Sequence, residues 1–129
     1  MKKILMLVVA LMAVGCAEQV PVNLNTLVQQ GDLLLDRETM TPYTGPVFRE
    51  NNGRRIAAFL KDGKLDGMVE SYYENGQLRE RGPFKDGVAE GLSEGYHENG
   101  ELWVRGRYKD GEKCGQWFEE GETVLYDSC

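Results

Sequence analysis

The sequence predicts an all-β protein, an elongated antiparallel meander of tandem β-hairpin repeats, and three observations support this fold class. The 16 glycines recur at regular places with aromatic residues between them, which is typical of short strands joined by tight turns. Residues 67–90 align without a gap on residues 91–114 and are identical at 12 of 24 positions. Within each copy an Asn-Gly pair alternates with a Lys-Asp-Gly triplet, and both favour chain reversal.

The N-terminal segment, residues 1–15, has the pattern of a secretion signal peptide. Lys2 and Lys3 provide the positive charge, and an apolar stretch of about 11 residues, expected to be helical, follows from Ile4 to Val14. A permanent transmembrane anchor is the alternative, but the stretch is shorter than the roughly 20 residues that a membrane-spanning helix needs. We therefore expect export and cleavage.

The segment Ala13-Val14-Gly15-Cys16 resembles a bacterial lipobox, although Ala13 stands where leucine is more frequent. The resemblance implies cleavage before Cys16 and acylation of its thiol, with palmitate among the acyl chains. Several acyl chains anchor a protein more firmly than a single myristoyl group does. Ala17, in place of aspartate, implies sorting to an outer membrane. We therefore expect a lipoprotein of the bacterial cell envelope that faces the periplasm or the cell surface.

Residues 16–42 lack the repeat. Residues 16–30 are predicted to be a tether that follows the lipidated Cys16. Residues 31–42 are predicted to form an N-terminal cap of one strand and a turn, because Leu33-Leu34-Leu35 is followed by turn-forming residues. Terminal units of repeat arrays are usually atypical, so we expect this cap to cover the upstream edge of the sheet.

The repeat region is predicted to span residues 43–129. Its copies are 43–66, 67–90, 91–114 and a truncated copy, 115–126. Counted from Gly45, the repeat equivalent of Gly67 and Gly91, the first copy is about two residues shorter than the second and third. Each unit consists of a strand, a turn, a strand and a second turn, so that every hairpin stacks on the next and contacts remain local.

Two hairpin registers compete at Asn75-Gly76. A two-residue turn places charged residues opposite one another: Glu70 and Arg81, then Glu94 and Arg105. A three-residue turn, Glu74-Asn75-Gly76 with a glycine bulge, gathers apolar residues on one face: Met68, Tyr72, Leu78 and Phe84, then Leu92, Tyr96, Leu102 and Tyr108. We favour the second register, because burying a large apolar side chain stabilises by roughly 1.5–3 kcal/mol and an exposed ion pair by about 0–1 kcal/mol.

The shared pattern G-x-x-x-x-Y-x-E-N-G-x-L-x-x-x-G-x-Y/F-K-D-G starts at Gly67 and again at Gly91, and it resembles the bacterial variant of the MORN repeat. The resemblance covers about two thirds of the chain. It implies a protein-interaction or scaffold module, or a platform close to a membrane. Similar bacterial chains carry the name YwqK-type antitoxin, which implies an alternative: an antitoxin-like or immunity-like inhibitor that binds a toxin or effector. Export fits poorly with an antitoxin that acts in the cytosol, so we favour the scaffold.

Cys114 and Cys129 are the two thiols other than Cys16. Cys114 stands where the preceding copy has Glu90, and a turn near Glu120-Gly121 brings the two C-terminal cysteines within reach of each other. In an oxidising envelope compartment such a pair favours a disulfide over two free thiols. The bridge would tether the last hairpin, whose edge is exposed.

Four aromatic positions vary between the copies and are the candidate protein-binding residues: Tyr73, His97, Trp103 and Trp117. Aromatic side chains are favoured interface anchors, but in a thin sheet they can instead cover a neighbouring hairpin. His97 replaces Tyr73 of the preceding copy, which favours a variable strand position over a catalytic base.

The remaining sequence gives no sign of catalysis or of metal binding. No serine has a paired base in a recognisable motif, and no His/Cys set has metal-ligand spacing, so we expect no enzyme, no cofactor and no metal. Removal of Lys2 and Lys3 lowers the basic residues from 15 to 13, against 21 acidic residues, for a formal charge of about −8. This charge disfavours nucleic acid as a partner. We expect a membrane contact through the N-terminal lipid and an interaction with a protein.

Overall fold

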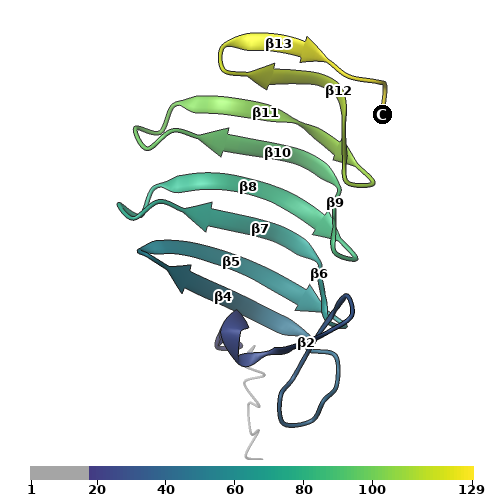
Figure 1. Cartoon of the computed structure of the whole chain (residues 1–129). Coiled ribbons are helices and arrows are strands. Elements are labelled where there is room, and N and C mark those ends of the chain that lie inside the picture. Colours follow the sequence, from purple (N-terminus) through teal and green to yellow (C-terminus); the bar gives the residue numbers. More distant parts are fainter. Residues whose placement is uncertain (1–17) are drawn as a thin grey trace, which may run out of the picture.

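The computed structural model describes residues 18–129, which form a large antiparallel meander of consecutive hairpins (Figure 1). The expected all-β repeat fold is confirmed, whereas the expected signal helix in residues 1–15 and the lipidated Cys16 lie outside the described residues. The sheet runs in the order β1-β4-β5-β7-β8-β10-β11-β12-β13, with β6 paired to β5 and β9 to β8. Within residues 18–129, no helix has the length and apolar character to cross a membrane.

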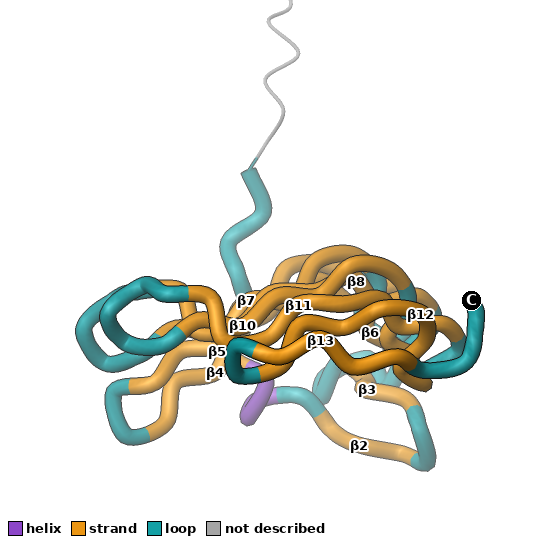
Figure 2. Tube along the Cα trace, turned by 90° about the horizontal axis from the view of Figure 1, so that it is seen from above, coloured by secondary structure: helices purple, strands orange, loops and turns teal. Residues whose placement is uncertain are grey.

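The repeat strands follow one another in space as they do in the sequence. Their bounds are β4 (Gly45–Asn51), β5 (Arg54–Lys61), β6 (Lys64–Leu65), β7 (Gly67–Tyr72), β8 (Leu78–Lys85), β9 (Val88–Ala89), β10 (Gly91–Tyr96), β11 (Leu102–Lys109), β12 (Glu112–Glu119) and β13 (Glu122–Leu125). Figure 2 shows this sheet from above as a single curved layer. Neighbouring hairpins supply most of the packing, as expected of a quasi-linear array.

The chain uses two kinds of turn between these strands. In the two-residue turns both residues have positive φ, as the type I′ geometry requires, and they are Asn52-Gly53, Asp62-Gly63, Asp86-Gly87, Asp110-Gly111 and Glu120-Gly121. At Glu74-Asn75-Gly76 only Gly76 has positive φ, and its N–H donates to Tyr73 O at 3.0 Å. The shorter Asn52-Gly53 turn lies in the first copy, which is about two residues shorter than the others when counted from Gly45.

The hairpin of β7 and β8 contains both of the registers that the sequence left in competition. Beside the turn, Tyr72 lies opposite Leu78, as the favoured register predicts. A β-bulge then leaves Arg79 unpaired and shifts the ladder by one residue, so that Glu70 lies opposite Arg81. The favoured register is therefore wrong for most of the hairpin.

The bulge also changes which side chains share a face. Met68 lies opposite Pro83 and Phe84 opposite Gly67, so Met68 and Phe84 are on opposite faces of the sheet. The next hairpin repeats the arrangement, with Leu92 opposite Arg107, Tyr108 opposite Gly91, and Trp103 as the unpaired residue. The single apolar stripe expected from the sequence is thus divided between the two faces.

The upstream edge is covered by residues that were expected to be a tether. Residues 16–30 were predicted to be a linker, but β1 (Val22–Asn23), the 3₁₀ turn η1 (Leu24–Thr26) and β2 (Val28–Gln30) occupy part of this range. β1 pairs in parallel with β4 and so covers the outer edge of β4. The prediction failed because these short elements carry no periodic pattern and are held by tertiary contacts.

The predicted cap, residues 31–42, forms the second half of the same unit. Its strand β3 (Leu33–Leu35) pairs with β2 in a separate two-stranded sheet. Leu27 packs with Val47 and Leu60 in a buried cluster, and Leu60 is 0% exposed. Residues 22–42 together therefore form the folded cap, which covers one face of the sheet at its upstream end as well as the edge strand.

Candidate interaction surface

A broad groove of about 950 Å³ runs across the strands on one face of the sheet. The floor of the groove contains the small residues Gly82 and Ser93. Gly82 lies opposite Val69 within one hairpin, and Ser93 lies opposite Gly106 within the next. A Cβ on Gly82 would lie 2.3 Å from Ser93 Oγ, so these two residues are in close contact across β8 and β10. Glycine inside a strand often marks such a close approach, and here it leaves the sheet backbone near the surface of the groove.

The walls of the groove consist of larger side chains at repeat-equivalent positions. Phe84 and Tyr108, 24 residues apart, lie toward the Lys-Asp-Gly turns, while Arg79 and Trp103 come from the bulges beside the Asn-Gly turns. Trp103 is half-buried, and the Nε1 atom of its indole would lie 2.8 Å from a Cβ on Gly95. The groove therefore has aromatic rings on both sides.

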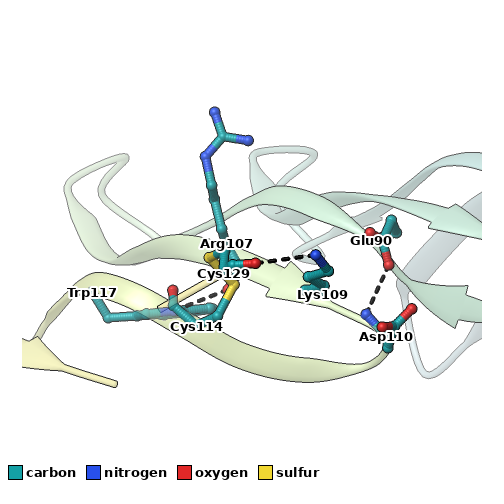
Figure 3. Close-up of a disulfide and its surroundings, with 7 residues drawn as sticks. All are labelled: Glu90, Arg107, Lys109, Asp110, Cys114, Trp117 and Cys129. Atoms are coloured by element: carbon teal, nitrogen blue, oxygen red, sulfur yellow. Dashed lines mark hydrogen bonds between the residues drawn. A yellow bond between two sulfur atoms is a disulfide. The ribbon is translucent and has the colours of Figure 1, made fainter. Parts of the chain in front are cut away.

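Trp117 closes the downstream end of the groove. This residue is 2% exposed, and a Cβ on Gly106 would lie 2.0 Å from its Cδ2 atom, so the indole lies directly on the Gly106 backbone. The ring meets Tyr108 edge to face at 5.0 Å between centroids. The indole Nε1 donates to Arg107 O at 3.1 Å and to Cys114 O at 3.2 Å (Figure 3). Trp117 thus has a structural role, which was one of the two alternatives for it.

A polar group of three residues packs beside this indole. Lys113 Nζ lies 4.6 Å from the centroid of the Trp117 ring and 2.7 Å from Glu119 Oε1, which also accepts a hydrogen bond from Tyr126 Oη at 2.8 Å. The hydrogen bond from Lys113 holds the pKa of Glu119 below its ordinary value. The same bond raises the pKa of Lys113, although desolvation opposes this. Both shifts favour the charged pair at neutral pH.

Cys114 and Cys129 are joined by a disulfide at the downstream end of the array (Figure 3). The tail that carries Cys129 is also held by backbone hydrogen bonds from Gly115 N to Asp127 O and from Tyr126 N to Gly115 O. Lys109 Nζ donates to Cys129 O at 3.0 Å. These contacts hold the tail beside β12, whereas the outer edge of β13 has no strand beyond it in the described part of the chain.

The other three candidate aromatic residues gather at the Asn-Gly turns of neighbouring hairpins. Tyr73 Oη donates to Tyr96 O at 2.6 Å and so links one repeat to the next. Exposed His97 lies 6.3 Å from Trp103 between ring centroids. In the preceding repeat, Tyr73 and Arg79 stand at the positions of His97 and Trp103. The guanidinium of Arg79 lies 6.0 Å from the centroid of the Tyr73 ring. The structure therefore brings together Tyr73, His97 and Trp103 and places Trp117 apart from them.

The opposite face carries a ladder of alternating charges that the favoured register did not predict. Across β7, β8, β10 and β11 the residues in register are Glu70, Arg81, Glu94 and Arg105. The hydroxyl of Tyr72 donates to Glu70, and that of Tyr96 donates to Glu94. These hydrogen bonds raise the pKa of both tyrosines, and desolvation adds to the effect. The recurrence of Glu, Tyr and Arg at a spacing of 24 was the signal for this ladder.

Comparison with known proteins supports the repeat and little beyond it. The family described as MORN repeat variant matches residues 65–86 and 89–110. No curated protein matches the sequence. Two solved structures of TarM, one of them a mutant from S. aureus in complex with Fondaparinux, alpha-GlcNAc-glycerol and UDP, align with TM-scores of 0.46 and 0.45 at 15% identity. Each alignment covers 79% of this chain, but the chain spans only about a fifth of those proteins, 22% and 21%. The chain therefore contains two adjacent segments, residues 65–86 and 89–110, that match the MORN repeat variant.

Proposed function

We propose that this protein is a lipid-anchored component of the bacterial cell envelope whose β-hairpin repeats form a protein-interaction or scaffold module. The observation that carries the proposal is the groove, which lies between the cap at the upstream end of the sheet and Trp117 at the downstream end. Upstream, the cap covers Val47 and Leu60, and downstream Trp117 covers Gly106. Between them, glycine and serine leave the floor open beneath aromatic and charged walls. Interface anchors are commonly aromatic residues and arginine, and Trp103 and Arg79 are of this kind.

The position of the cap supports a short connection to the membrane. Folded structure begins at Val22, so five residues separate Cys16 from the first strand. Five residues fully extended reach about 20 Å at most. If Cys16 is lipidated, the array is held close to the membrane surface, where an envelope partner can meet it. A Cys16→Ser variant should lose both palmitate labelling and membrane attachment, and continued attachment of this variant would contradict the proposed anchor.

The interaction itself is tested by crosslinking in intact envelopes followed by capture of the full-length protein. Trp103→Ala should reduce the yield of the crosslinked partner while the melting temperature changes little, because Trp103 is half-buried on the groove wall. Leu125→Ala is the matched control, since Leu125 is 78% exposed and lies on the last strand away from the groove. Equal partner yields from the wild type and the Trp103 variant would argue against the groove as the binding surface. Unfolding of that variant would assign Trp103 a role in the core.

A further inference from the structure

The groove contains an unfilled copy of the site that Trp117 occupies in the last repeat. Trp117 is the repeat equivalent of Ser93, Gly106 of Gly82, and Tyr108 of Phe84, each pair being 24 residues apart. Downstream, the indole of Trp117 lies on Gly106 and meets Tyr108 edge to face. One repeat upstream, the glycine floor and the aromatic wall are both present, but a serine stands where the indole would begin.

The contacts of Ser93 define the size of this space. A Cβ placed on Gly82 would lie 2.3 Å from Ser93 Oγ. A Cβ placed on Gly106 would similarly lie 2.0–2.4 Å from ring atoms of Trp117. Ser93 therefore fills only the part of the site nearest the backbone. Gly82, Phe84, Ala89 and Ser93 all line the groove, so the volume beyond the serine belongs to it. Ala89 is the equivalent of Lys113, which covers the Trp117 ring, so this side of the upstream site is also open.

We infer that this slot, formed by Gly82, Phe84, Ala89 and Ser93, receives an aromatic side chain, tryptophan above all, from a protein partner. The inference rests on the proposed interaction function and names the anchor residue of the partner. The fold itself supplies the precedent, because an indole is already held on an equivalent floor against an equivalent wall. A glycine backbone allows a flat ring to approach closely, and an edge-to-face contact with Phe84 adds to the burial.

The polar end of the indole also has an acceptor in the upstream site. Downstream, Nε1 donates to the carbonyls of Arg107 and Cys114, whose repeat equivalents are Pro83 and Glu90. Pro83 O accepts a hydrogen bond from Glu90 N at 3.0 Å, and a carbonyl oxygen has a second lone pair for another donor. A leucine side chain would match the apolar wall but would leave this acceptor unused. Tryptophan should therefore bind in preference to leucine.

The direct test is an NMR titration of the full mature protein with N-acetyl-tryptophanamide, with N-acetyl-leucinamide as the matched probe. We expect saturable shifts at the amides of Gly82, Phe84 and Ser93 with the tryptophan probe and weaker binding of the leucine probe. The absence of localised shifts, or equal binding of the two probes, would overturn the inference. Selective binding of methyl N-acetylglucosaminide at the same amides would also overturn it, because the slot would then take a sugar ring. None of these outcomes depends on a variant.

The slot can also be filled from within. Ser93→Trp should place an indole on Gly82 as Trp117 lies on Gly106, and it should weaken binding of the tryptophan probe by about tenfold or more, as expected for loss of an anchor pocket. Ser93→Ala keeps the slot open and should retain binding. The thermal unfolding of both variants reports whether they are folded. Unchanged binding by a folded Ser93→Trp variant would refute the assigned position.

Envelope crosslinking separates this inference from the proposed function. If the wild type captures a partner and the folded Ser93→Trp variant captures it equally well, the slot is not the anchor, although the interaction module stands. If the tryptophan probe binds the slot but no partner is captured by the wild type, the slot stands and the proposed function fails. Loss of capture in the Ser93→Trp variant, with capture retained in Ser93→Ala, supports both.

Discussion

The indole of Trp117 lies on the backbone of Gly106, where any Cβ would come within 2.0 Å of the ring. The φ angle of Gly106 is not positive, so its backbone conformation does not require glycine. Glycine is required here because a side chain would collide with the indole. Three elements meet through this contact, because the indole joins β11 to β12 and also lies 6.2 Å from the Tyr126 ring beyond β13. The downstream end of the array is therefore organised around one glycine and one tryptophan.

Substitution of this glycine gives the first prediction. Gly106→Ala should lower the free energy of unfolding by about 1–3 kcal/mol, because the new methyl group displaces a well-packed ring. Urea unfolding measures the change. Gly82→Ala is the matched variant, and it should cost less, because the obstructing Ser93 hydroxyl can rotate away. Equal losses for the two variants would mean that the Trp117 ring does not determine the cost.

The disulfide gives the second prediction. Its two cysteines are separated by 15 residues, and closing a loop of this length should stabilise the protein by about 3 kcal/mol through the entropy of the unfolded chain. Cys129→Ser should therefore lower the midpoint of urea unfolding, and a Cys114→Ser/Cys129→Ser double variant should show about the same loss. Mass spectrometry after non-reducing digestion should find the linked peptides. Two alkylatable thiols in the native protein would rule out the bridge.

The cap gives the third prediction. Leu27→Ala should lower the free energy of unfolding by about 2–4 kcal/mol, because Leu27 is buried against Val47 and Leu60. Leu125→Ala should change it by about 0.5 kcal/mol or less, since this leucine is 78% exposed. Differential scanning calorimetry compares the two variants. If Leu27→Ala proved as mild as the control, the residues before the repeats would not serve as a folded cap.

The pair formed by Lys113 and Glu119 gives the fourth prediction, which concerns acid stability. The lowered pKa of Glu119 contributes stability that is present above its ordinary value of 4.5 and is lost as the pH falls through the lower folded-state value. Glu119→Gln should therefore lose less stability than the wild type on acidification below about pH 4.5. Glu122→Gln, at an exposed position in the same hairpin, should follow the wild type. Parallel acid profiles for the Glu119 variant and the wild type would contradict a contribution from the pair.

Local signals in the sequence determine the turns, and these were predictable. The Asn-Gly and Asp-Gly turns depend on neighbouring residues that tolerate positive φ, so their positions could be read directly. The register was not predictable in the same way, because the bulge at Arg79 lets one hairpin satisfy two pairings in succession. Burial energy alone favoured a single apolar face, whereas the hairpin keeps Tyr72 opposite Leu78 and Glu70 opposite Arg81.

The site was predictable only in part, for a similar reason. The variable aromatic positions were visible from the repeat, and Tyr73, His97 and Trp103 do lie together. The buried state of Trp117 depends on Gly106, which lies on the neighbouring strand. A glycine inside a strand is itself a signal of close approach, and Gly82 and Gly106 at a spacing of 24 could have indicated a ring lying across the strands. The cap residues, from Val22 to Leu27, follow no period and gain their order from contact with the first hairpin.

The cap and Trp117 lie at opposite ends of the repeat array, so the number of repeats between them sets the length of the groove. Each 24-residue unit contributes two full strands, and neighbouring strands are about 4.8 Å apart, so one additional copy between β8 and β10 would lengthen the floor by about 10 Å. Neither end would need to change, because the cap packs on Val47 and Leu60 of the first hairpin and the indole packs on Gly106 and Tyr108 of β11, both outside the insertion point. Duplicating or deleting a single unit should therefore change the length of the groove by about 10 Å and, under the proposed function, the length of the partner segment that it accommodates.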